Sequence, residues 1–220
     1  CLSMDLRKDE GKEALRKLIK ISDVVVQNFR PGTIDEMGFG YDVLKQLNPR
    51  IIMVNVSAYG QFGPYREKIG YDPIGQVMSG IAMVTGEEGM PPIRAGVPII
   101  DRTTALHSAI GTLAALLERN ISGQGQSIDV CLADSGYSFT EIPITAYHGA
   151  GVEPRRGRSD AAPSGTYPCK DGWVLISAGD QHHWPRVCSA LGKPEWLDGP
   201  RFTERRERSK HGAVVHEAMV

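Results

Sequence analysis

Two short apolar runs decide the fold, Asp23-Val24-Val25-Val26 and Ile51-Ile52-Met53-Val54-Asn55-Val56. Both are rich in β-branched residues and too short for a helix, which is typical of buried strands in a parallel sheet. An amphipathic pattern precedes each run, over residues 10–20 and residues 41–47. This alternation predicts an α/β fold, with a Rossmann-like parallel sheet and helices on its faces.

The rest of the first 150 residues continues the alternation. After an irregular stretch around residues 60–73, the pattern predicts a glycine-softened helix over 74–84 and a long helix over 103–119. The long helix carries Leu106, Ile110, Leu113 and Leu117 on one face, and His107, which lies away from this stripe, is expected to be exposed. Residues 127–132 alternate polar and apolar as in a half-buried strand, and residues 133–147 are expected to be helical despite Pro143.

A change of composition near residue 150 indicates a second, smaller domain. A hairpin is predicted from residue 165 to residue 176, around the turn Lys170-Asp171-Gly172. We therefore assign residues 1–150 to part of a large Rossmann-like domain, and residues 151–220 to a linker and the start of a small domain. The strand expected before the first helix is missing, so we interpret the chain as a piece of a longer protein.

Composition excludes several classes of partner. The 220 residues include 25 basic and 26 acidic ones, a formal charge of -1, so no nucleic-acid or anionic-membrane partner is predicted. The longest apolar runs fall far short of a membrane span of about 20 residues. The four cysteines lack metal-ligand spacing, and His182-His183 has no third ligand at a useful spacing, so no metal site and no disulfide framework is expected.

Asp101 is the first candidate catalytic residue. It is expected immediately before the 103–119 helix, where the helix start stabilises a carboxylate by about 0.3–1 kcal/mol. Such a carboxylate is available as a nucleophile, and nearby amides could hold an oxyanion. The alternative is that Asp101 is simply a helix N-cap. Asp72 and Asp134 are rival carboxylates that a cap or turn role would explain equally well.

A second candidate is the loop Asn28-Phe29-Arg30-Pro31-Gly32, which follows the first strand. Its planar cation and aromatic ring suit a phosphorylated or adenine-bearing ligand. The alternative is an ordinary turn whose arginine is only solvated. Neither a Walker loop nor a G-x-G-x-x-G after a strand is present in the sequence.

Several sequence blocks follow one another along the chain. They are the helix start Leu6-x-x-x-x-Gly11-Lys12, Asp23-Val24-Val25-Val26-Gln27-Asn28-Phe29-Arg30-Pro31-Gly32, Met37-Gly38, Tyr59-Gly60-Gln61-Phe62-Gly63-Pro64, Gly70-Tyr71-Asp72, Gly96-Val97-Pro98-Ile99-Ile100-Asp101 and Gly123-Gln124-Gly125-Gln126-Ser127-Ile128-Asp129. In this order and spacing the blocks resemble the class III CoA-transferases, a family that includes formyl-CoA, carnitine and succinyl-CoA:dicarboxylate CoA-transferases and is related to the α-methylacyl-CoA racemases. The resemblance implies an interlocked homodimer of the full-length protein. It also implies a coenzyme A thioester as substrate and no tightly bound cofactor.

The resemblance also assigns roles to residues. Asp101 would attack the acyl-CoA thioester and form an aspartyl mixed anhydride or thioester, so that CoA passes to another carboxylic acid. The stretches Pro163-Ser164-Gly165-Thr166-Tyr167 and Lys170-Asp171-Gly172-Trp173 look closer to the dicarboxylate-using members, so a dicarboxylate is the expected acceptor. The residues expected to bind CoA or substrate are Asn28, Phe29, Arg30, Pro31, Met37, Gly60 and Tyr71.

Tyr71 separates the two branches of this fold, because the racemases place a histidine at its position. A tyrosine, with a usual pKa of about 10, is poorly suited to exchanging an α-proton at neutral pH. A transferase is therefore favoured over a racemase or epimerase, and a non-catalytic CoA-binding protein is a further alternative. The expected compartment is the cytoplasm, or the mitochondrial matrix or a peroxisome in a eukaryote.

Overall fold

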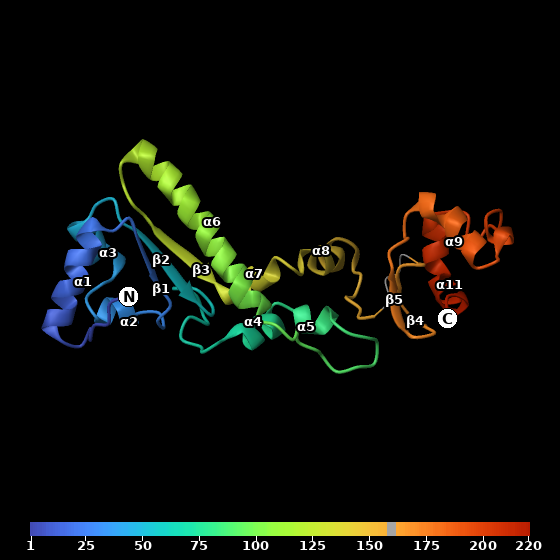
Figure 1. Cartoon of the computed structure of the whole chain (residues 1–220), viewed down its shortest axis with the longest axis horizontal. Coiled ribbons are helices and arrows are strands. Elements are labelled where there is room, and N and C mark those ends of the chain that lie inside the picture. Colours follow the sequence, from blue (N-terminus) through green and yellow to red (C-terminus); the bar gives the residue numbers. More distant parts are fainter. Residues whose placement is uncertain (158–161) are drawn as a thin grey trace. The chain divides into compact units, whose positions relative to one another are not determined.

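The computed structural model describes residues 1–157 and 162–220 (Figure 1). The chain divides into two compact units, residues 1–155 and residues 156–220.

A parallel sheet forms the centre of the first unit (Figure 1). Its strands β1 (Val24–Gln27), β2 (Ile52–Ser57) and β3 (Ser127–Cys131) lie side by side in sequence order. Residue 24 pairs with residue 52, and residue 53 pairs with residue 127. Parallel neighbours need a crossover connection, and helices supply both of them. The predicted α/β class, with a parallel sheet and flanking helices, is confirmed.

Helices cover both faces of this sheet. On one face, Ile19 of the first helix and Leu44 of the third bury against Met53 of β2. On the other face, Ala115 of the long helix packs against Val54, the next residue of β2. The helices are α1 (Asp9–Ile21), α2 (Thr33–Glu36), α3 (Tyr41–Leu47), α4 (Asp72–Met78), α5 (Ile81–Val84), α6 (Ile99–Ser122), α7 (Leu132–Tyr137) and α8 (Glu141–Ala150).

Three helix predictions need correction. The helix expected over 74–84 is two helices, α4 and α5, separated at Gly80, whose φ of 83° is left-handed. The helix expected over 133–147 is also two helices, and Pro143 falls in the first turn of α8, where its missing N–H costs nothing. The long helix α6 begins at Ile99, so Asp101 lies inside its first turn and not before it.

The apolar stripe predicted on α6 does not face the sheet. The helix packs with its small residues, and a Cβ on Gly111 would lie only 3.3 Å from Ile128. His107, expected to be exposed, is partly buried, with its Nδ1 3.1 Å from the Ser135 hydroxyl. No helix in the described part of the chain, α6 included, has the length and apolarity to cross a membrane. The exposed stripe, 62–70% accessible, consists of Leu106, Ile110, Leu113 and Leu117.

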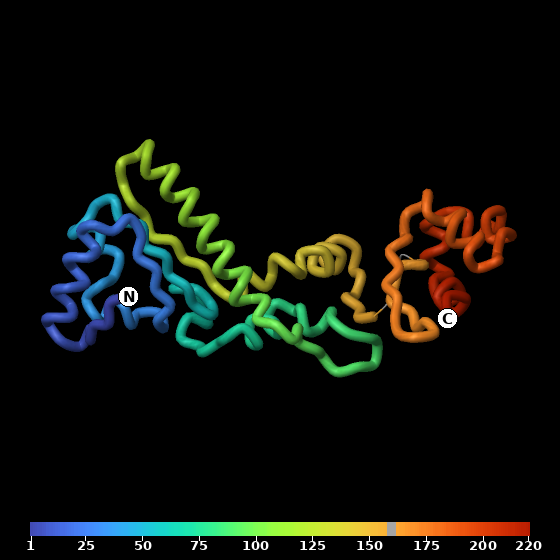
Figure 2. Tube along the Cα trace, in the orientation of Figure 1, coloured from blue at the N-terminus to red at the C-terminus, as the bar shows by residue number. Residues whose placement is uncertain are grey.

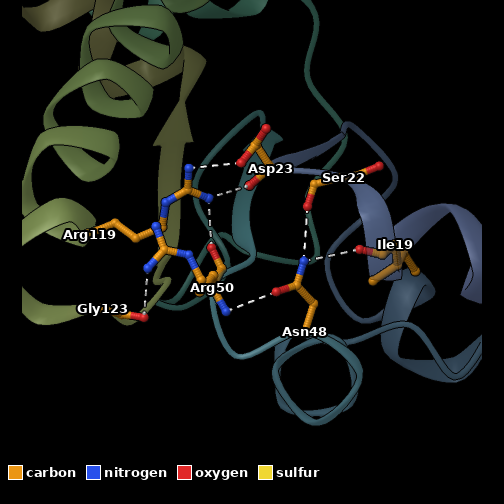
Figure 3. Close-up of polar contacts among 7 residues, drawn as sticks. All are labelled: Ile19, Ser22, Asp23, Asn48, Arg50, Arg119 and Gly123. Atoms are coloured by element: carbon orange, nitrogen blue, oxygen red, sulfur yellow. Dashed lines mark hydrogen bonds and ion pairs between the residues drawn. The ribbon is translucent and has the colours of Figure 1, made fainter.

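Buried Arg119 fixes the amino ends of the strands (Figure 3). One Nη atom donates to the Arg50 carbonyl at 2.9 Å, and the other contacts the Asp23 carboxylate at 2.9 Å. Beside them, the Asn48 side chain donates to the Ile19 carbonyl at 3.2 Å. The two Arg119 contacts join α6 to the segments that enter β1 and β2. The opposite, carboxyl edge of the sheet is where parallel sheets bind ligands.

The second unit begins with the predicted hairpin, drawn in orange in Figure 2, made of β4 (Gly165–Cys169) and β5 (Gly172–Ile176) paired antiparallel. Its core gathers Trp184, Cys188, Phe202 and Val215. The guanidinium of buried Arg208 lies 4.4 Å from the centre of the Trp184 ring. Its helices are η1 (Gln181–His183), α9 (Trp184–Ala190), η2 (Pro194–Trp196), α10 (Arg205–Lys210) and α11 (Gly212–Ala218).

Candidate active site

A cavity of about 680 Å³ lies at the carboxyl ends of β1 and β2. One face of α6 forms a wall of small residues, and the end of the long 58–71 segment forms another. Its volume is within the range of small-molecule sites. The lining residues are Val26, Gln27, Asn28, Val54, Val56, Ser57, Ala58, Gly70, Tyr71, Asp101, Thr104, Ala105, Ser108, Ala109, Thr112 and Leu132.

Three residues that the sequence proposes for the site line this one cavity. Asn28 follows β1, Tyr71 precedes α4, and Asp101 stands in the first turn of α6. Tyr71 is 72% exposed, and Asp101 is exposed as well, so a ligand in the cavity can reach both. The fold therefore brings together an amide, a phenol and a carboxylate from three separate parts of the chain.

Asp72, and not Asp101, caps α6. The Asp72 Oδ1 accepts the backbone N–H of Ile100 at 2.7 Å and that of Asp101 at 3.2 Å. The alternative interpretation of Asp101 as an N-cap is therefore wrong. The expectation that amides at this helix start hold an oxyanion is also wrong, because their hydrogens are already donated. The Ile99 N–H goes to the Val97 carbonyl at 2.8 Å.

The Asp101 carboxylate is left free to react. Among the described residues, no hydrogen bond or ion pair reaches it. Partial desolvation in the cavity raises the pKa of Asp101 above its usual value, and the nearby Asp72 carboxylate raises it further. By Brønsted behaviour, a more basic carboxylate is a stronger nucleophile once it is ionised.

The comparisons with known proteins fit this arrangement. The model of CoA-transferase family III matches residues 1–220, which is the whole chain. The chain belongs to CoA-transferase family III. A succinyl-CoA–D-citramalate CoA-transferase of Chloroflexus aurantiacus is 40% identical over 222 residues, covering 99% of this chain and 55% of the relative. A succinate–glutarate CoA-transferase of Agrobacterium fabrum is 32% identical and covers 98% of this chain and 54% of the relative.

Solved structures confirm the fold of this family III chain. A CaiB/BaiF family protein from Brucella suis superposes with a TM-score of 0.81 at 33% identity, over 99% of this chain and 60% of that one. The Rv3272 protein from Mycobacterium tuberculosis superposes with a TM-score of 0.86 at 26% identity, over 99% of this chain and 60% of that one. The chain spans about half the length of the curated relatives it matches.

The other proposed family III residues do not line the cavity. Phe29 and Arg30 are exposed, Pro31 is half-buried, and Arg30 has no ion pair among the described residues. Met37 packs against the core around Ile19, so its side chain has a structural contact. Gly60 is buried with a φ of 91°. Their contacts with CoA stay a prediction.

Two buried amides shape the loop after β1, and the sequence interpretation missed them. The Gln27 Nε2 donates to the Asn55 Oδ1 at 2.8 Å, and the Gln27 Oε1 accepts the Phe29 N–H at 2.7 Å. The Asn55 Nδ2 continues the row to the Ser127 hydroxyl at 3.0 Å. The signal was available, because a Gln and an Asn interrupt otherwise apolar buried strands, and buried amides need partners.

The remaining rival, Asp134, lies outside the cavity. It is exposed in the first turn of α7, whose cap is Cys131. The Cys131 Sγ accepts the Asp134 N–H at 3.3 Å. Burial raises the pKa of the Cys131 thiol to about 11, so this sulfur stays protonated and is a poor nucleophile at neutral pH.

The second unit gathers one possible set of metal ligands. Asp180, two residues before His182, supplies a carboxylate, and the ligand atoms of Asp180, His182 and His183 lie within 4.8 Å of one another. The prediction that His182-His183 has no third ligand at a useful spacing is therefore wrong. Asp180 also pairs with Arg205 at 3.4 Å, a cation that competes with a metal ion for this carboxylate. The absence of a metal site stays a prediction.

Proposed function

We propose that the full-length protein transfers CoA from an acyl-CoA donor to a carboxylic acid, with Asp101 as the nucleophile. One observation carries the proposal. In a chain of CoA-transferase family III, an unpartnered aspartate carboxylate lines a cavity at the carboxyl ends of the strands. That position is where parallel α/β sheets bind their ligands.

The first half of the reaction forms an activated aspartate. An oxygen of Asp101 attacks the thioester carbonyl carbon of the donor, the C–S bond breaks, and CoA leaves as a thiolate. The product is a mixed anhydride between the donor acid and Asp101. Attack of the thiolate on the Asp101 carbonyl carbon then releases the donor acid and leaves an aspartyl-CoA thioester.

The second half repeats these steps in reverse with the acceptor. The acceptor carboxylate attacks the aspartyl thioester, CoA leaves again, and a new anhydride forms. The thiolate attacks the acceptor's acyl carbon and frees Asp101, so no atom is left over and no water is consumed. Exclusion of water preserves the thioester's free energy, which hydrolysis would discard.

The loop after β1 is suited to the nucleotide end of CoA. Arg30 is an exposed cation without an ion pair among the described residues, and Phe29 is exposed beside it. A guanidinium binds phosphate through charge-assisted hydrogen bonds. We place the phosphates of CoA near Arg30, while the thioester reaches Asp101 through the cavity past Asn28.

A dicarboxylic acid is the proposed acceptor, and succinyl-CoA the first donor to test. The named substrates of the two relatives support this choice, since they pair succinyl-CoA with D-citramalate, and succinate with glutarate. Racemisation is disfavoured because no histidine is among the cavity-lining residues, and Tyr71 stands where the second base would be needed.

A screen of donors and acceptors with the full-length protein tests the proposal. Succinyl-CoA and other acyl-CoAs are incubated with panels of mono- and dicarboxylates, in deuterium oxide, and the product masses are recorded. We expect a new acyl-CoA without deuterium at its α-carbon. Deuterium wash-in without CoA exchange would establish a racemase instead, and CoA binding without either reaction would leave only a binding protein.

A further inference from the structure

The cap of α6 comes from a different helix. Asp72 is the first residue of α4 and is only 6% exposed, yet its Oδ1 holds two backbone N–H groups at the start of α6, those of Ile100 and Asp101. The helix has no side-chain cap of its own, since its N-cap residue is Pro98. Asp72 does not line the cavity. Asp72 therefore holds the start of α6 without lining the cavity itself.

Gln76, one turn further along α4, completes the arrangement. Its side chain is fully buried, and its Nε2 donates to the Asp72 Oδ2 at 2.6 Å. The same amide reaches the segment that enters α6, because its Oε1 accepts the Ala95 N–H at 2.8 Å and its Nε2 lies 3.3 Å from the Val97 carbonyl. Both carboxylate oxygens of Asp72 are thus held, and the entry to α6 is tied to α4.

We propose that Asp72 and Gln76 are positioning residues for Asp101: by holding the backbone at the start of α6, they fix the direction in which the Asp101 carboxylate enters the cavity. This inference rests on the proposed function of Asp101. The backbone N–H that Asp72 holds belongs to Asp101 itself, so a shift of the cap moves the nucleophile directly. Displacing a reacting group by about 1 Å can cost about 100-fold in rate.

The charge of Asp72 gives the arrangement a measurable signature. Among the described residues, Asp72 is the charged group that acts on the Asp101 carboxylate, and Tyr71 is the other titratable side chain on the cavity wall. Burial and the charge of Asp72 raise the pKa of Asp101. Turnover needs ionised Asp101, so removing the Asp72 charge moves the acid limb of the pH–rate profile to lower pH.

Two variants of the full-length protein test the proposal. Asp72→Asn removes the charge but keeps one acceptor oxygen for the start of α6. In this variant the amide nitrogen introduced at position 72 would face the Gln76 Nε2, and both atoms are hydrogen-bond donors. The double variant Asp72→Asn with Gln76→Glu restores a donor–acceptor pair and moves the negative charge one helical turn along α4. The control is Asp42→Asn, which removes an exposed carboxylate from the first turn of α3.

Four quantities are measured for each variant: kcat and KM with succinyl-CoA, the acid limb of the pH–rate profile, and backbone amide hydrogen exchange at residues 99–102. For Asp72→Asn we expect kcat to fall by about 10- to 100-fold with KM within about 3-fold. The acid limb should move to lower pH and amide exchange should become faster. The double variant should recover part of kcat with the acid limb still displaced, and Asp42→Asn should change none of these.

Unchanged kcat, acid limb and amide exchange in Asp72→Asn, with Asp101 still essential, would overturn the proposal. If Asp72→Asn does not fold, the double variant alone tests the proposal. An acid limb at its original pH together with full kcat in the double variant would then overturn the proposal. Failure of the proposed function is a separate result: full turnover by Asp101→Ala would remove the nucleophile, whatever Asp72 does.

Discussion

Replacing Gly75 by alanine tests how closely α4 must approach α6. A Cβ on Gly75 would lie 2.8 Å from the Cγ2 of Ile100 and 3.4 Å from two more Ile100 atoms. Ile100 is completely buried, so it cannot turn away, and the two helices must separate by about 0.6 Å to reach ordinary contact. Overpacking costs typically about 1–3 kcal/mol, and replacing a helical glycine by alanine returns about 1 kcal/mol. We expect a net loss of up to about 2 kcal/mol of unfolding free energy.

Separation of α4 from α6 would also disturb the site, because the Ile100 N–H donates the 2.7 Å hydrogen bond to Asp72 of α4. Gly75→Ala should therefore also lower kcat by about 10-fold or more. The assays are steady-state kinetics and urea-dependent amide exchange of peptides covering residues 72–84 and 99–110. Gly149→Ala is the matched control, since a Cβ on this α8 glycine meets nothing within 4 Å. If Gly75→Ala were as stable and as active as Gly149→Ala, the close approach of α4 and α6 would be refuted.

Three further predictions concern other contacts. Arg30→Ala should weaken CoA binding by about 1.5–3 kcal/mol in calorimetry, since it removes a charge-assisted phosphate contact. The control Arg16→Ala, at a half-buried arginine of α1, should leave the affinity unchanged. If both variants bound CoA equally well, Arg30 would be only a solvated loop residue. Arg119→Met should lower the unfolding free energy in urea by about 2–4 kcal/mol because two partly buried hydrogen bonds to backbone carbonyls are lost. Asp23→Asn should change the unfolding free energy by less than about 0.5 kcal/mol, because the Asp23 carboxylate is 76% exposed. A larger loss of stability in Asp23→Asn than in Arg119→Met would contradict the role given to the Arg119 contacts drawn in Figure 3. Turnover should fall on the acid side at a higher pH than for an ordinary aspartate, because protonation of Asp101, whose pKa is raised, removes the nucleophile.

The strands and the hairpin were predictable because their signals are local. Buried β-branched runs specify β1 and β2, and the Lys-Asp-Gly turn specifies the hairpin of β4 and β5. The helix pattern singled out Asp101 as a candidate, and the resemblance to the class III CoA-transferases assigned it a role. The resemblance also named Asn28 and Tyr71, and both line the same cavity as Asp101, while the roles of all three stay predictions.

The packing of α6 was not predictable from its pattern. Its large apolar residues suggest the packing face, but close approach to the sheet selects small side chains, such as Gly111 and Ala115. The cap was misjudged for a related reason. Local rules assign a cap to the nearest carboxylate, Asp101, whereas the actual cap, Asp72, lies 28 residues before Ile100. Tertiary contacts of this kind leave no periodic signal.

The most direct test of the account is to trap the activated aspartate. The full-length protein is incubated with succinyl-CoA and hydroxylamine and then digested. The mass of the peptide that contains Asp101 is measured by mass spectrometry, and the Asp101→Asn variant is the control. An anhydride or thioester on Asp101 reacts with hydroxylamine to give a hydroxamate, so we predict a modified Asp101 and loss of activity that both depend on succinyl-CoA. Continued CoA exchange with an unmodified Asp101, or a hydroxamate on a different carboxylate, would contradict the central claim.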